Sequence, residues 1–226
     1  MLVARSLEPR YLSNAYLVGD REGGTAVFVD SGAPVEPLLE FARAHGLTPT
    51  HVLRTHADAD HIEHEGKLGL PVVTGPLETG GLRVEAIPTP GHKDDMICFV
   101  VSDGPIKDDS DEVLVFSGDT LFKDAVGGGN FEQIKRSVMD VYMTMPHERR
   151  LLPGHTDEST IGREWEKNPF VRVWRGADPE GTQRVTVRGR PATLVVWSPD
   201  YDGKGKAWVR YDDGADAIVG GSAVER

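Results

Sequence analysis

The segment THADADH, residues 55–61, places two histidines and two aspartates within seven positions of an otherwise ordinary acidic chain. It continues the apolar run THVLRTH, which predicts a buried strand that delivers Thr55 and His56 at its end. If the chain turns into a helix near His61, the intervening loop tip is free of the strict alternation of strand faces, and the side chains can converge. Imidazole and carboxylate together suit borderline and hard divalent metals. The segment therefore predicts metal ligands at His56, Asp58, Asp60 and His61.

Three further segments have the same form, with one metal-competent residue directly after an apolar run. They contain His92 in IPTPGH, Asp119 in VFSGDT and His155 in LLPGH. A single His or Asp after a strand is usually a turn residue. Four such segments, in this order and beside these glycines, instead indicate one shared centre. His64, one helical turn after His61, is either a substitute ligand, an outer partner or an ordinary surface residue.

The chain of 226 residues reads as strands interrupted by helices, which predicts an α/β fold. A hairpin is expected from YLSNAYLVG and TAVFVDSG, and an amphipathic helix from PVEPLLEFARAHG. Further strands are expected in PVVTG, LRVEAIPTPGH, MICFVVSD, EVLVFSGD and RRLLPGH. Helices are expected in NFEQIKRSVMDVYMTM and in DESTIGREWEKN, the latter ending at Asn168 and Pro169.

The amino-acid composition and the hydrophobic pattern of the sequence change near Arg175. The stretch RGADPEGTQR is rich in Gly, Pro and charge, and short alternating strands follow it. These features predict one domain over residues 1–174 and a small all-β, barrel-like module of about five strands over residues 175–226. Within this module, Trp197, Trp208 and Tyr211 form either a binding platform or core. The segment DYDGKG lacks the oxygen ligands of a calcium loop at Lys204 and Tyr211.

Over about residues 8–172 the sequence resembles the metallo-β-lactamase superfamily, whose pattern is T-H-x-H-x-D-H followed by a His, an Asp and a His. The resemblance implies a four-layer αβ/βα sandwich that carries its metal ligands at strand ends. The segments GDTLF, NFEQIKRSV, LLPGH and TIGREWEKNPF are similar to the glyoxalase II-like (hydroxyacylglutathione hydrolase-like) branch. Residues 125–130, AVGGGN, lack the Arg, Lys or Cys that related sequences often carry there, and this difference argues against glutathione.

The resemblance implies a binuclear site. His56 and His92 would bind the first metal, Asp60, His61 and His155 the second, and Asp119 would bridge them. Asp58 departs from the pattern, because most members have a histidine there, whereas flavodiiron proteins have a Glu and use iron.

The carboxylate of Asp58 adds one negative charge to the expected ligand set. We expect this charge to raise the pKa of a bridging water and to make iron or manganese more competitive with zinc. Alternatively the first site binds weakly and one ion suffices, or Asp58 points away and accepts hydrogen bonds in a turn.

The leading hypothesis is a metal-dependent hydrolase with two divalent ions, zinc being expected before iron or manganese. A metal-bound hydroxide would attack a thioester or other ester carbonyl, with Asp60 and Asp119 as catalytic residues. One alternative is a mononuclear iron oxidoreductase that resembles persulfide dioxygenases. Another is a non-catalytic metal-binding sensor or binding module whose working part is the C-terminal barrel.

A formal charge of -11 argues against a nucleic-acid partner. The single cysteine, Cys98, has no intrachain partner and fits a reducing cytoplasm. The sequence shows neither a signal peptide nor a membrane-spanning run. We therefore expect a cytoplasmic protein with a small-molecule substrate and no membrane partner, and homo-oligomer formation stays open.

Overall fold

The first sheet of the computed structural model, which describes residues 1–109 and 111–226, has five strands in the order β1-β2-β3-β4-β5. β1, β2 and β3 are antiparallel, whereas β3, β4 and β5 are parallel. The predicted hairpin is β2 and β3. The strands are β1 (Leu2–Leu7), β2 (Asn14–Gly19), β3 (Thr25–Val29), β4 (Thr48–Leu53) and β5 (Val72–Val73), and the associated helices are α1 (Glu36–Ala44), α2 (Ala59–Ile62) and α3 (Glu65–Leu68).

The second sheet has six strands in the order β13-β12-β9-β8-β7-β6 and is antiparallel except for the parallel pair β9 and β12. Its strands are β6 (Leu77–Thr79), β7 (Leu82–Pro88), β8 (Ile97–Asp103), β9 (Val113–Gly118), β12 (Arg150–Pro153) and β13 (Ser159–Thr160), and β10 (Leu121–Phe122) with β11 (Ala125–Val126) forms a small hairpin. The helices are α4 (Phe131–Asp140), α5 (Ile161–Lys167) and α6 (Pro169–Trp174), with a 3-10 turn, η1 (Tyr142–Thr144), after α4. No helix in the described ranges is both long and apolar enough to cross a membrane.

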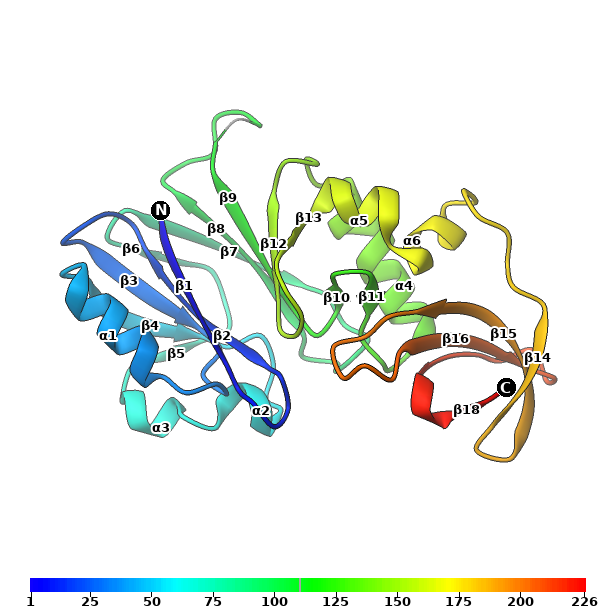
Figure 1. Ribbon diagram of the computed structural model, residues 1–226. Coiled ribbons are helices and arrows are strands. Elements are labelled where there is room, and N and C mark those ends of the chain that lie inside the picture. The colour runs from blue at the N-terminus through cyan, green and yellow to red at the C-terminus, as the bar shows by residue number, and fades with distance from the viewer. Residues whose placement is uncertain (110) are drawn as a thin grey trace.

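The two sheets pack face to face, and each has helices on its outer side (Figure 1). In β3, Val27 and Val29 point into the core between the sheets, while Ala26 and Phe28 point toward α1. This alternation follows from the two-residue period of a strand, and it explains why β3 is apolar on both faces. The predicted four-layer αβ/βα sandwich is therefore confirmed.

β1 and α6 are among the elements that the sequence analysis did not predict. The segment LVARSL forms β1, which pairs with β2 from Leu2 opposite Gly19 to Leu7 opposite Asn14. Asn168 ends α5 as predicted, but it also begins α6, because its side-chain oxygen accepts the backbone N–H groups of Phe170 and Val171. Pro169 is tolerated there, since the first helical residue needs no hydrogen-bonded N–H.

The C-terminal segment forms a curled antiparallel sheet in the order β17-β16-β15-β14-β18. A register shift between Leu194 and Val196 in β15 accompanies this curvature. Trp208 is buried and lies 4.9 Å from Phe131 of α4, centroid to centroid, so the three aromatics of this module do not share one exposed platform. The elements are β14 (Gln183–Val187), β15 (Arg190–Ser198), β16 (Lys206–Tyr211), β17 (Asp216–Gly220), η2 (Gly221–Ala223) and β18 (Val224–Glu225).

One hydrophobic cluster includes residues from both sides of the predicted division at residues 174 and 175. Val196 and Ile218 of the C-terminal sheet belong to it together with Ile134 of α4 and Phe170 of α6. The C-terminal sheet thus packs against the helices that cover the second sheet, and the division into two domains stays a prediction.

Candidate metal centre

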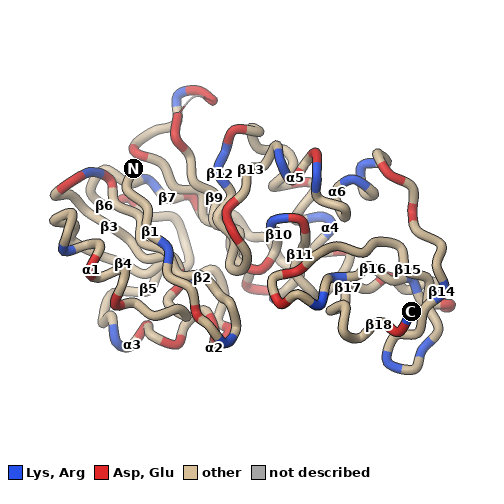
Figure 2. Tube along the Cα trace, in the orientation of Figure 1, with Lys and Arg blue, Asp and Glu red and all other residues tan. Residues whose placement is uncertain are grey.

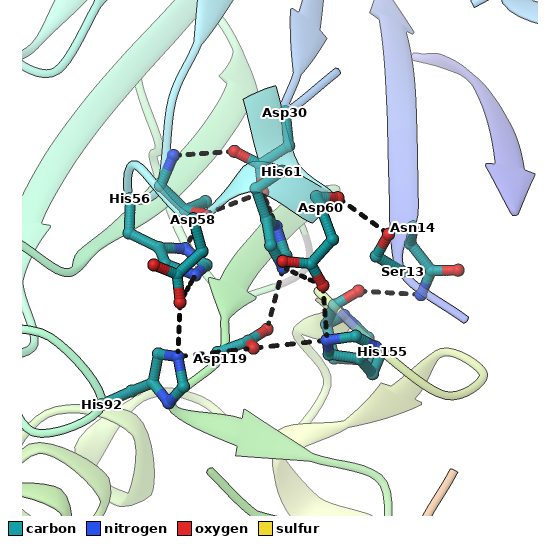
Figure 3. A network of polar contacts seen from close by, with 12 residues as sticks. Ser13, Asn14, Asp30, His56, Asp58, Asp60, His61, His92, Asp119 and His155 are labelled. Atoms are coloured by element: carbon teal, nitrogen blue, oxygen red, sulfur yellow. Dashed lines mark hydrogen bonds and ion pairs between the residues drawn. The ribbon is translucent and has the colours of Figure 1, made fainter. Parts of the chain in front are cut away.

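The seven predicted ligands come together where strands of both sheets end (Figure 3). β4 leads to His56 and Asp58, α2 carries Asp60 and His61, and the ends of β7, β9 and β12 lead to the remaining residues, His92, Asp119 and His155. The Asp119 carboxylate lies in the middle. Its Oδ1 is 3.3 Å from Nε2 of His61, and its Oδ2 is 3.3 Å from Nε2 of His155.

The ligand atoms fall into three groups, each with its atoms within 4.8 Å of one another. These groups are His56, Asp58 and His92; Asp60, His61 and His155; and His56, His61 and Asp119. The first two correspond to the two predicted trios. The third joins one histidine of each trio to Asp119, which is the arrangement a bridging carboxylate requires.

Each imidazole in the centre is held through its Nδ1 atom. His92 donates to the carbonyl of Gly128 and His155 to the carbonyl of Leu12, at 2.8 and 3.0 Å. His61 donates to Asp30 at 2.8 Å. His56 lies 3.0 Å from the Thr55 hydroxyl, whose own hydrogen is donated to Asp30. With Nδ1 protonated, the lone pair is on Nε2, which faces the centre, as a metal ligand requires.

Several polar atoms in the centre are buried without a hydrogen-bond partner. They are Nε2 of His56, Nε2 of His61 and Oδ1 of Asp119, among the residues the structure covers. Buried polar atoms are normally satisfied, so these three need a ligand. Gly154 leaves space beside them, since a Cβ there would lie 2.3 Å from Oδ1 of Asp119. Imidazole nitrogens and carboxylate oxygens around this space fit divalent metal ions.

The electrostatics favour a cation at this place. Burial alone would raise the pKa of Asp119, but His61 and His155 hold that pKa well below its usual range. Burial alone would lower the pKa of His61, yet Asp119 and Asp30 hold it well above the usual value. Burial, assisted by the charge of His61, lowers the pKa of His56. Without a metal, His61 therefore holds a proton beside the ionised Asp119, and a divalent ion bound at Nε2 would supply positive charge in place of that proton.

Asp58 points into the centre rather than away from it. Its Oδ2 lies 3.2 Å from Nε2 of His92 and 3.7 Å from Nε2 of His56. Its other oxygen pairs with Lys93 at 2.9 Å. Burial raises the pKa of Asp58, but the bonds from Lys93 and His92 outweigh burial and lower it. Asp58 thus occupies the place of a first-trio ligand, with a lysine partner that the sequence did not suggest.

Three partners of the histidines were missed in the sequence, and only one of them had a signal. Asp30 follows the apolar run VFV, the same form that identified His92, Asp119 and His155. The other two are carbonyl groups, at Leu12 and Gly128, and a backbone atom leaves no trace in residue identity. His64 lies outside the three ligand groups of the described residues, and its backbone N–H donates to Ser31.

The AVGGGN loop is more than a connection. Gly128 holds His92, and a Cβ on Gly127 would lie 1.8 Å from the backbone oxygen of Asp119. Gly129 forms an isolated β-bridge with Ile218 of β17. The glycines therefore allow the loop to pack against both the centre and the C-terminal sheet.

Comparisons with known proteins agree with this geometry. Residues 9–62 match the family model of the metallo-beta-lactamase superfamily. The probable metallo-hydrolase YqgX of Bacillus subtilis is 28% identical over 205 residues, which cover 70% of this chain and 92% of that protein.

Two solved structures add to the comparison. ETHE1 from Myxococcus xanthus has a TM-score of 0.64 and 26% identity, covering 79% of this chain and 92% of its own. TTHA1623 in a di-iron-bound form has a TM-score of 0.57 and 27% identity, covering 75% and 100%. The fold, the matched segment and these relatives together support placing the chain in the metallo-β-lactamase superfamily.

Proposed function

We propose that the protein is a metal-dependent hydrolase that cleaves a thioester or another ester, as in the glyoxalase II-like branch. The observation that carries this proposal is the convergence of three unsatisfied buried atoms, on His56, His61 and Asp119, between the two ligand trios. The superfamily and the similarity to a probable metallo-hydrolase support a hydrolytic enzyme.

Divalent ions in such a centre polarise a substrate carbonyl and make water a nucleophile at neutral pH. His56, Asp58 and His92 would hold one ion, Asp60, His61 and His155 the other, and Asp119 would bridge them. Asp60 is more accessible than Asp119, with 22% of its side chain exposed against 9%, and is placed to accept a proton from water. Burial raises the pKa of the Cys98 thiol to about 12, so this cysteine offers no thiolate nucleophile.

Zinc is the first choice of metal in this proposal, with iron or manganese as the alternatives. Four imidazoles suit zinc, whereas the third carboxylate, Asp58, moves the ligand set toward harder ions. The di-iron form of TTHA1623 supports iron in a relative of this fold.

A second candidate function is iron-dependent oxidation at a single ion. The trio of His56, Asp58 and His92 has the two-histidine, one-carboxylate composition of many non-haem iron sites. The two functions differ in metal content and in the need for oxygen.

The test begins with elemental analysis of protein purified without added metal, followed by a panel of thioesters, other esters and lactones. We expect close to two ions per chain and hydrolysis without oxygen uptake. One tightly held iron per chain, with oxygen consumption on a persulfide, would replace hydrolysis by oxidation. Metal-loaded protein that turns over neither kind of substrate would favour the sensor hypothesis.

His61→Ala and His155→Ala should each lose one metal equivalent while the fold survives. Both side chains lie with Asp60 in the second trio, and their removal leaves the first trio intact. Metal content by elemental analysis and folding by circular dichroism measure the result. The matched control is His64→Ala, which should keep both ions because His64 lies outside the ligand groups. If both variants keep the full metal content, the second site is assigned wrongly.

A further inference from the structure

The β15–β16 loop, residues 199–205, extends from the C-terminal sheet toward β10 and the end of β12 (Figure 1). At its tip, the ring of Tyr201 stacks on the imidazole of His155, with centroids 4.0 Å apart and an angle of 11° between the planes. Phe122 of β10 meets Tyr201 edge to face at 5.9 Å. An aromatic residue outside the predicted catalytic domain thus covers a predicted metal ligand.

The position of Tyr201 is fixed by a buried ion pair. Asp200 lies 2.9 Å from Lys206, and their side chains are only 3% and 10% exposed. The carboxylate of Asp200 also accepts the backbone N–H of Tyr201, and its carbonyl accepts that of Gly203. Buried charges are costly unless paired, so keeping this pair favours the loop conformation that places Tyr201 on His155.

Tyr201 also lines a pocket of about 330 Å³, a size typical of small-molecule sites. Leu7, Leu12, Pro199 and Thr156 contribute to the same pocket. Because Leu12 binds Nδ1 of His155 and Tyr201 stacks on the same ring, the pocket lies beside this predicted ligand.

The charged groups around the pocket are already paired with one another. Arg5 binds Asp157 at 3.1 Å, and Lys123 lies 3.9 Å from the same carboxylate. Asp124 binds Arg163 at 2.9 Å, and Asp200 is held by Lys206. Figure 2 shows the two signs of charge interspersed along the chain. The pocket therefore offers an apolar surface rather than a surplus charge, and Leu7 is 46% exposed within it.

We propose that this pocket binds the apolar acyl group of the substrate and that Tyr201 is its specificity-determining residue. The reaction in this inference rests on the proposed ester or thioester hydrolysis, whereas binding in the pocket does not require turnover. An acyl chain that covers Leu7, Leu12 and the ring of Tyr201 removes apolar surface from water. The C-terminal sheet would thereby select the substrate of a centre to which it contributes no ligand.

The test measures the binding of linear acyl hydroxamates, from aceto- to octanohydroxamate, to the metal-loaded full chain by titration calorimetry. Hydroxamates bind metals through their head group, so the series varies only the chain. We expect affinity to rise about two- to fourfold per methylene until the pocket is filled, as the burial of one methylene allows.

Tyr201→Ala should lose most of this dependence on chain length while acetohydroxamate binds within about twofold of its original affinity. Tyr201→Phe keeps the ring and should keep the dependence. Leu7→Ala, at a half-exposed position, should weaken it. The matched control is Tyr211→Ala in the same sheet, where Tyr211 contacts Arg190 and lines no part of the pocket.

The outcomes separate this inference from the proposed hydrolysis. If hydroxamate affinity does not rise with chain length in the original protein, the pocket assignment is wrong, even if esters are hydrolysed. The pocket assignment is also wrong if affinity rises equally steeply with chain length in Tyr201→Ala and Leu7→Ala. If affinity rises steeply with chain length but the protein hydrolyses neither esters nor thioesters, the pocket assignment stands and the proposed hydrolase function is wrong. Where hydrolysis occurs, Tyr201→Ala should raise KM for octanoyl but not acetyl substrates.

Discussion

Asp119→Asn should lower metal affinity by more than about 100-fold and remove turnover. Removing a group that only hydrogen-bonds to a metal ligand already lowers metal affinity about 10- to 100-fold. Asp119 lies between the two trios and would bind both ions directly. The amide has nearly the same shape but no charge to offer either ion. Metal titration of chelator-treated protein and kcat/KM on the best substrate measure the effect.

Two further variants calibrate this result. Asp30→Asn removes the charge that holds Nδ1 of His61, and it should cost about 10- to 100-fold in affinity, less than Asp119→Asn. Asp103→Asn changes an exposed carboxylate at the end of β8, outside the ligand groups, and should leave metal binding unaltered. Two tightly held ions in Asp119→Asn would refute the bridging role.

Asp58→His should raise zinc affinity at the first trio and shift the activity profile toward lower pH. The substitution replaces a carboxylate by a neutral imidazole 3.2 Å from His92, so the centre becomes more positive by one charge. A more positive centre favours the ionised form of the attacking water and lowers its pKa. The ascending limb of activity, which follows that ionisation, should therefore move to lower pH. Zinc titration and a pH profile of kcat/KM measure both effects.

Asp58→Asn separates charge from ligation, because it removes the negative charge without supplying an imidazole. It should weaken the first site, where Asp58→His strengthens it. In both variants Lys93 loses its partner, but with 45% of its side chain exposed it is solvated readily. A histidine variant with unaltered metal content and pH profile would show that Asp58 only accepts the bonds from Lys93 and His92.

The sequence indicated which side chains would come together, because four of the predicted ligands directly follow apolar strands and the other three belong to the THADADH segment. His56, His92, Asp119 and His155 could be recognised one by one, and the sandwich brings strand ends to one edge. Asp30 had the same signal and was overlooked. β1 was also missed, since it lies partly exposed at the edge of its sheet and lacks a strong apolar alternation.

The contact of Tyr201 with His155 could not be derived from the sequence. Their rings meet only because the C-terminal sheet packs on α4 and α6, which places a hairpin loop beside the end of β12. The sequence analysis considered the segment DYDGKG only as a calcium loop and rejected it on its spacing. Its role follows from tertiary packing, which residue order alone does not encode.

The shared hydrophobic cluster has a consequence for how such a chain can change during evolution. Val196, Trp208 and Ile218 shield Phe131 and Trp174, so loss of the C-terminal segment would uncover aromatic surface on α4 and α6. Uncovered surface of this kind promotes aggregation. A descendant could discard the segment only after its helices had acquired polar residues. The C-terminal sheet and the helices α4 and α6 are therefore expected to be inherited together.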